Sequence, residues 1–224
     1  MSSELELCRH LSVSRTVLRE SIKVLASKGM IDVRPKVGIL VRPRSDWNLF
    51  DPELLEWQQE DGVDDLFLNN LFEVRFIVEP AAAELAAVRA SADEIELLFS
   101  AYREMEATVR DRPAYIAADL KFHSIIIAAC HNDLLVQLNS TLRAAFRRSQ
   151  NVVTPDPEGP ATSLPRHKEV ADAISNHNGR QARSAMERLV KLGMLDFFRQ
   201  LSGDTPETLP RLAITPGSRV QGAG

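Results

Sequence analysis

The stretch from Ser12 to Gly29 constrains the fold more than any other part of the chain. Ser14 can cap a helix through its hydroxyl oxygen, and Gly29 stands where a helix would end. The apolar residues between them recur at helical spacing and predict a buried stripe, made of Val17, Leu18, Ile22 and Leu25. The sequence therefore predicts one amphipathic helix here.

The opposite face of this predicted helix is polar and basic, and its outward side chains are Arg15, Thr16, Arg19 and Lys23. A short helix over residues 4–10 is predicted before it, with Leu11 turned inward at the intervening turn. This is the layout of a helix-turn-helix whose second helix reads the DNA major groove. Taken by itself, the longer helix fits a surface helix with solvated charges equally well.

The residues that follow favour DNA binding. Two β-prone runs, Met30 to Arg34 and Ile39 to Arg42, flank the turn-forming segment Pro35 to Gly38 and predict a hairpin with a basic tip. A helix-turn-helix followed by such a hairpin is a winged helix-turn-helix. Residues 1–45 hold nine Lys and Arg against four Asp and Glu, whereas residues 46–224 carry a net charge of −9. Only the first part of the chain is thus expected to meet a polyanion.

Four motifs of this region carry a family resemblance: Leu11 to Thr16, Val17 to Glu20, Lys28 to Ile31 and the hairpin 35–41. They look like the DNA-binding domain of the GntR family of bacterial transcription regulators. The resemblance and the outward face of the helix predict operator contacts by Arg15, Thr16, Arg19, Lys23 and Gly38. The family's domain normally begins with one further helix, which we expect to be missing because this chain starts almost inside the second.

The segment after the hairpin contains both tryptophans of the chain, Trp47 and Trp57. They lie beside an apolar stripe, and Asp51-Pro52 can start a helix. We expect the two aromatic side chains to dock this linker on the following domain. The Trp-Asn and Asp-Pro-x-x-Leu-x-Trp pattern resembles the linker of GntR regulators of sugar-acid catabolism.

The rest of the chain is helical in pattern, with apolar residues on one face of each segment and a Pro-rich loop from Val153 to Pro165. The predicted helices cover residues 64–89, 93–110, 113–130, 132–150, 163–176 and 179–201. The sequence therefore predicts a mainly α protein, a partial winged helix-turn-helix followed by an all-α helical-bundle effector domain. The predicted limits are 1–44 for the winged domain, 45–63 for the linker, 64–202 for the bundle and 203–224 for a disordered tail.

The sequence also indicates the cellular compartment in which the protein is expected. No apolar run approaches the roughly 20 residues that cross a bilayer, and the N-terminus lacks an apolar signal segment. We therefore expect a cytoplasmic protein with no membrane partner. Cys8 and Cys130 lie far apart in helical contexts, which favours reduced core thiols over a disulfide.

Arg75 lies within an otherwise apolar run of the first bundle helix. A buried guanidinium needs an anionic partner, because removing it from water alone is costly. Two interpretations remain open. Arg75 forms a salt bridge to Glu79 at the next turn or to another acid, or it binds a ligand carboxylate through paired hydrogen bonds.

Asp119 and His123 are four residues apart and share one helix face, and His167 opens another inward-facing row. The spacing suits metal ligands. On spacing alone, however, an aspartate that orients a core histidine through a hydrogen bond is favoured, and His167 by itself fits a helix cap or a core histidine better than a ligand.

Residues 45–200 as a whole resemble the ligand-binding domain, called FCD, of the FadR-type subfamily of GntR regulators. The likeness rests on the positions of Glu73 to Arg75, Glu79-Pro80, Asp119 with His123, Asn132, and His167 with Asp172 to Ile174. In many relatives an Asp and three His hold a divalent metal to which an organic acid binds. Asp119, His123 and His167 match three of these positions, and the third histidine falls at Leu189. The resemblance implies effector binding by Arg75, Asp119, His123 and His167, either around Zn²⁺ or a similar ion or without metal.

The sequence thus predicts a dimeric DNA-binding repressor of a sugar-acid catabolic operon, released from operator DNA by a small organic acid. It is not expected to be an enzyme. One alternative is a metal-dependent enzyme that uses Asp119, His123 and His167, since three ligands with an open position are also a catalytic arrangement. The other is an effector-binding protein that has lost DNA binding with its first helix.

Overall fold

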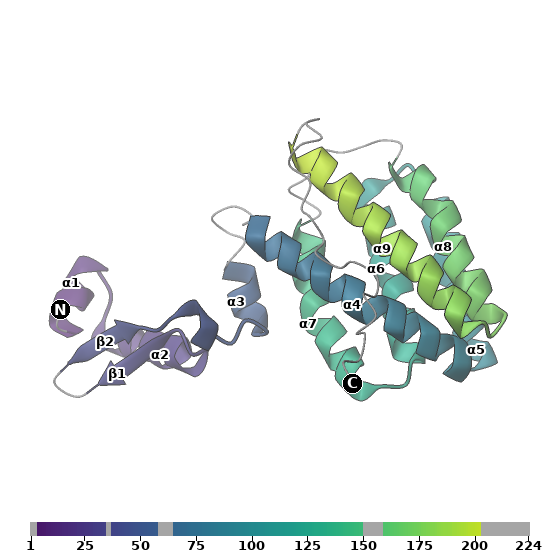
Figure 1. The fold of residues 1–224 in the computed structure, drawn as a ribbon. Coiled ribbons are helices and arrows are strands. Elements are labelled where there is room, and N and C mark those ends of the chain that lie inside the picture. The colour runs from purple at the N-terminus through teal and green to yellow at the C-terminus, as the bar shows by residue number, and fades with distance from the viewer. Residues whose placement is uncertain (1–3, 35–36, 58–64, 150–158, 203–224) are drawn as a thin grey trace, which may run out of the picture. The chain divides into compact units, whose positions relative to one another are not determined.

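A computed structural model describes residues 4–34, 37–57, 65–149 and 159–202 (Figure 1). The chain divides into two compact units, Met1–Glu60 and Asp61–Gly224. The fold is mainly helical, as the sequence predicts. The predicted hairpin tip Pro35-Lys36, the end of the linker, residues 153–158 of the Pro-rich loop and the tail 203–224 lie outside the described residues.

The first unit contains the predicted short helix, basic helix and hairpin. In chain order its elements are α1 (Glu4–His10), α2 (Arg15–Ser27), β1 (Ile31–Arg34), β2 (Gly38–Val41), the 3-10 helix η1 (Arg44–Asp46) and α3 (Pro52–Trp57). The two strands are antiparallel, and Ile31 pairs with Val41. Gly38 has a φ of 101°, a backbone conformation that favours glycine, at the start of β2.

Helix α2 begins and ends where the sequence predicts. The Ser14 hydroxyl accepts a hydrogen bond of 3.2 Å from the backbone N–H of Val17. Lys28 is the C-cap residue, and Gly29 follows it with a φ of 74°. A glycine in this left-handed conformation is the common way for a helix to stop.

The predicted buried stripe of α2 is only partly correct. Leu18 is buried, but Val17 is 53% exposed, and Leu11, expected to turn inward, is 55% exposed. Within the described residues, α2 packs on α1 and on β1. These short elements cover the Leu18 side of the helix and leave the side chains of Val17 and Leu11 in solvent.

The linker folds back onto the hairpin. The indole N–H of Trp47 donates a hydrogen bond of 2.9 Å to the Arg42 carbonyl oxygen at the end of β2. Trp47 thus has a partner within its own unit, and docking of the two tryptophans on the following domain stays a prediction. Helix η1 follows β2 after two residues and brings Trp47 back to the end of the hairpin.

The described part of the second unit is a helical bundle whose elements correspond to the six predicted segments: α4 (Asp65–Arg89), α5 (Ala92–Ala107), α6 (Arg112–Ala129), α7 (Asp133–Ser149), α8 (Gly159–Ser175) and α9 (Gly179–Ser202). The long helices α4 and α9 lie side by side, and α8 packs along α9 (Figure 1). The core includes Met105, Phe122, Ile126, Val170 and Met186, all at most 1% exposed. Cys8 and Cys130 are buried and free, as expected.

Helix α8 begins earlier than predicted. It starts at Gly159 and runs through Pro165, where a loop was expected. A proline inside a helix removes one backbone hydrogen bond, but tertiary contacts hold these first turns. The Tyr115 hydroxyl donates a hydrogen bond of 3.3 Å to the Pro160 carbonyl oxygen, and Leu164 packs against the core. Across the described ranges of the chain, no helix combines the length and apolar character that crossing a membrane requires.

Candidate functional site

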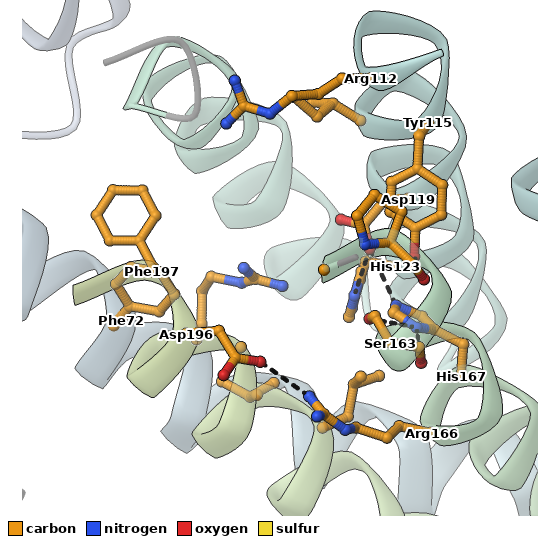
Figure 2. A pocket seen from close by; sticks show the side chains of 17 residues that line it. Phe72, Arg112, Tyr115, Asp119, His123, Ser163, Arg166, His167, Asp196 and Phe197 are labelled. Carbon is orange, nitrogen blue, oxygen red and sulfur yellow. Dashed lines mark hydrogen bonds and ion pairs between the residues drawn. The ribbon is translucent and has the colours of Figure 1, made fainter. Parts of the chain in front are cut away.

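A cavity of about 140 Å³ lies within the bundle and is lined by residues of α4, α6, α8 and α9 (Figure 2). A single water molecule occupies about 10–15 Å³ when cavity volume is measured in this way. The cavity therefore has room for a small polar molecule. The aromatic rings of Phe72 and Phe197, with centroids 5.1 Å apart, form one wall. The cavity brings together all four predicted effector residues, Arg75, Asp119, His123 and His167.

Asp119, His123 and His167 form a compact cluster at this cavity. Asp119 and His123 lie one turn apart on α6, and His167 comes from α8. Asp119 Oδ1 lies 2.9 Å from His167 Nε2 and 3.8 Å from His123 Nε2. One ligand atom from each residue lies within 4.8 Å of the others. One carboxylate and two imidazoles at this separation can hold a divalent cation.

The ring of His167 is held in place by the preceding turn of α8. Its Nδ1 lies 3.0 Å from the Ser163 carbonyl oxygen. Because a carbonyl only accepts, Nδ1 carries the proton, and Nε2 of a neutral ring then presents a lone pair. Nε2 is buried and faces Asp119 Oδ1 at 2.9 Å. A lone pair that faces a carboxylate calls for a proton or a cation between them, and a carbonyl behind the ring is typical of metal-binding histidines.

Glu79, considered from the sequence only as a partner of Arg75, also belongs to the site. It is 4% exposed and forms an ion pair with Arg75 one turn earlier on α4. Its Oε2 lies 2.7 Å from Nδ1 of His123. Burial opposes the charge of Glu79, but the neighbouring Arg75 and His123 outweigh it and hold its pKa well below the usual value. The structure therefore contains the salt bridge from Arg75 to Glu79 that was one of the two interpretations. Arg75 also lines the cavity.

The cavity keeps charges of both signs at neutral pH. Burial by itself would raise the pKa of Asp119, but His123, His167 and Arg75 lower it. Burial likewise opposes the charge of Arg75, but Glu79 and Asp119 raise its pKa. An incoming ligand therefore meets both a guanidinium donor and a carboxylate.

Sequence reasoning missed five other polar residues of the cavity wall, Arg112, Tyr115, Ser163, Arg166 and Asp196 (Figure 2). Arg112 and Tyr115 precede Asp119 on the same face of α6, so helical spacing counted back from Asp119 could have found them. Arg166 Nη1 lies 3.1 Å from Asp196 Oδ2, which joins α8 to α9. No local signal marks Asp196, since α9 reaches the cavity only through tertiary packing.

Leu189 occupies the position to which the resemblance assigns a third histidine. It is 4% exposed and lines the cavity. A leucine offers no ligand atom, so the cluster of described residues supplies three protein ligands.

The predicted DNA contacts lie on α2 and the hairpin of the first unit, where Arg15 and Thr16 are exposed in the first turn of α2. The Arg19 guanidinium donates hydrogen bonds of 3.0 and 3.2 Å to the Glu4 carboxylate, which raises the pKa of Arg19. Lys23 is paired with Glu20 at 2.7 Å. Exposed pairs of this kind contribute little to stability, so both cations can exchange their partners for phosphates or bases.

Two family profiles match this chain. Residues 3–41 match the bacterial regulatory proteins of the gntR family, and residues 70–192 match the FCD domain. The cavity residues from Phe72 to Leu189 lie within the second match.

The chain is also similar to individual transcription regulators. The galactonate operon transcriptional repressor of Escherichia coli (strain K12) is 34% identical over 83% of this chain and 81% of that protein. The HTH-type transcriptional regulator YieP of the same organism is 30% identical over 85% of this chain and 83% of that protein. The solved structure of Streptococcus agalactiae GntR matches with a TM-score of 0.54 and 26% identity over 85% of this chain and 86% of that chain. These matches are to regulators rather than to enzymes, which does not support the metal-dependent enzyme alternative.

Proposed function

The chain belongs to the GntR family of bacterial transcription regulators and carries an FCD domain, and from this premise we propose that it represses a sugar-acid catabolic operon until a small acid releases it from DNA. The family matches by themselves show that the chain is a transcription regulator of this type. The finer proposal is carried by the cavity, where Arg75, Asp119, His123 and His167 surround a space suited to a small polar molecule.

The proposed effector is a small hydroxylated carboxylate. The Arg75 guanidinium can donate to an effector carboxylate while its other hydrogens stay on Glu79. Asp119 can accept hydrogen bonds from effector hydroxyl groups. One relative is named for the galactonate operon, and galactonate has this chemistry. A sugar acid or a related keto-acid is therefore the effector class to test first.

A divalent cation such as Zn²⁺ fits the three-residue cluster. Asp119, His123 and His167 would hold it, and Nε2 of His167, which faces Asp119 at 2.9 Å, supplies a ring nitrogen of the required kind. Such an ion would offer open coordination positions to a carboxylate and an adjacent hydroxyl. In the metal-free alternative, His123, His167 and Arg75 bind the acid directly as hydrogen-bond donors.

The DNA-binding end is proposed to act in a homodimer in the cytoplasm, with the two copies of α2 reading two half-sites of an operator. The contacts are assigned to Arg15, Thr16, Arg19, Lys23 and Gly38. Effector binding would favour a bundle conformation in which the two winged units no longer match the half-site spacing. Release from DNA then follows from the difference in effector affinity between the two conformations.

The test uses the full chain and a DNA duplex that the protein itself enriches from a random pool. Arg19→Ala is expected to weaken binding to this duplex by about tenfold or more, since a lost base contact costs that much, and to leave acid binding unchanged. Arg103→Ala, which removes an exposed arginine of α5, is the matched control. Equal duplex affinity in Arg19→Ala and the parent would remove α2 from the DNA interface.

The effector half is tested by titrating galactonate and related acids, with and without a chelator, and by following heat release and duplex dissociation. Arg75→Ala is expected to abolish acid-driven dissociation while keeping duplex binding. Unchanged acid binding in this variant would remove Arg75 from the effector site. Loss of acid binding in chelator supports the metal-bound site, and binding that resists chelator supports the metal-free one.

A further inference from the structure

A buried lysine joins the end of the recognition helix to the linker helix. We propose that Lys28 is a positioning residue that fixes α3 to α2, so that the DNA-reading unit extends through Trp57 as one rigid body. This inference rests on the DNA-binding function proposed above and places the functional boundary of that unit beyond residue 44.

Lys28 is 5% exposed, although lysine is almost never fully buried unless it is paired. Its ammonium group lies 2.6 Å from Asp51 Oδ1 and 2.6 Å from Glu53 Oε2, and both acids stand at the start of α3. It also lies 5.3 Å from the ring centre of Trp57, at the end of α3. One side chain of the recognition helix thus contacts both ends of the linker helix.

The Asp51 carboxylate connects the two helices through a single oxygen. Oδ1 accepts the hydrogen bond from Lys28. It also accepts hydrogen bonds from the backbone N–H groups of Glu53 (3.0 Å) and Leu54 (3.1 Å) in the first turn of α3. Asp51 therefore caps α3 with the atom that binds Lys28. Its hydrogen bond and that of Glu53 raise the pKa of Lys28, so the charge persists at neutral pH.

Backbone contacts also connect the end of α2 to the linker. The Asn48 N–H donates a hydrogen bond of 2.8 Å to the Lys28 carbonyl oxygen. At Gly29 the linker approaches so closely that an added Cβ would lie 2.4 Å from the Asp46 carbonyl oxygen. Side-chain and main-chain contacts thus converge on the last turn of α2, away from the proposed DNA contacts Arg15 and Arg19 in its first turns.

The first experiment measures this junction without using DNA. Lys28→Met, Asp51→Asn and the double variant are unfolded in urea, and tryptophan fluorescence follows the first unit, since both tryptophans lie in it. The proposal expects strong non-additivity, because the second substitution removes a contact already lost. Additive effects of the two substitutions would overturn it.

The second experiment asks whether the junction positions the recognition helix. Lys28→Met is expected to weaken binding to the enriched duplex by about tenfold, as a misplaced set of base contacts would, while affinity for random duplex stays within about twofold of the parent. Lys191→Met, at an exposed lysine of α9, is the control. Equal losses on both duplexes would point to general destabilisation and overturn the positioning role.

If Lys28→Met does not fold, Glu53→Gln provides a second and milder test of the same junction. Glu53 is 65% exposed at its side chain, so its loss leaves Asp51 in place. A fall of about two- to threefold on the enriched duplex alone supports the junction, and unchanged binding argues against it. If the parent enriches no duplex at all, the proposed function fails, whereas the unfolding cycle still decides whether Lys28 joins the two helices.

Discussion

The two units of this chain are stabilised in different ways. In the bundle, long apolar side chains such as Met105, Phe122 and Met186 are fully buried in one cluster. In the described part of the first unit, the buried side chains are fewer and one is charged: Cys8, Leu18, Lys28, Ile31, Leu54 and Leu55. The bundle therefore depends on packing, and the winged unit depends more on single polar contacts and backbone conformations.

The units also place their charges differently. The bundle holds Arg75 and Asp119 at a cavity, with Glu79 buried beside Arg75, whereas Arg15, Arg19 and Lys23 stand on the outer face of α2. Buried charges can select one small ligand through close contacts. Exposed cations suit a polyanion whose phosphates extend over a large surface. Four substitutions test this comparison.

Phe122→Ala should have the largest effect. The side chain is 0% exposed, and its ring lies edge-on to His123 and His167 with centroids 5.8 and 5.1 Å apart. The cavity left behind should cost about 3–5 kcal/mol of bundle stability, measured by circular dichroism during urea unfolding. Leu97→Ala, at a 55% exposed position, is the control and should change stability by less than about 0.5 kcal/mol. A loss below about 1 kcal/mol in Phe122→Ala would break the comparison.

Glu79→Gln should cost about 3 kcal/mol, because it removes the carboxylate charge that pairs with the buried Arg75 guanidinium. The pKa of Glu79 is lower in the folded chain than its ordinary value of 4.5. Its contribution is therefore complete above that pH and is lost progressively as the pH falls below it. Unfolding curves of parent and variant should differ most near neutral pH and converge in acid. A constant difference across this range would contradict the ion pair.

Gly29→Ala should destabilise the winged unit alone, by about 2 kcal/mol. The position has a φ of 74°, and a Cβ there would collide with the Asp46 carbonyl oxygen. Tryptophan fluorescence should report earlier unfolding, while the helical signal of the bundle keeps its midpoint. A shift of both transitions together would mean that the two units unfold as one.

Gly193→Ala is the matched counterpart in the bundle and should have the smallest effect, of opposite sign. Gly193 lies inside α9, and an added Cβ would have no neighbour within 4 Å. Alanine restricts the unfolded chain more than glycine does, so stability should rise by about 0.5–1 kcal/mol. Destabilisation here would indicate that the wall of the cavity tolerates no added atom at this point.

Local features were predictable from the sequence. Ser14 caps α2, and Ser91 caps α5 in a reciprocal pair with Glu94 at the predicted break. The four-residue spacing of Asp119 and His123 places them on one face of α6, because helical geometry alone sets that relation. Such features depend on neighbours within a turn or two, so a linear sequence contains the information they need.

The tertiary structure decided which distant residues meet. Three pairs form only when whole elements are packed against one another: Lys28 with Asp51, Glu79 with His123, and Arg166 with Asp196. Helical periodicity tells which face of a helix is apolar, but it does not tell which helix covers that face or at what angle. The sequence therefore determined the family, the helices and three residues of the central cluster. Packing decided that a glutamate contacts this cluster and that Lys28 meets Asp51 and Glu53 at the start of α3, because both contacts depend on the relative placement of elements that the chain connects only through turns.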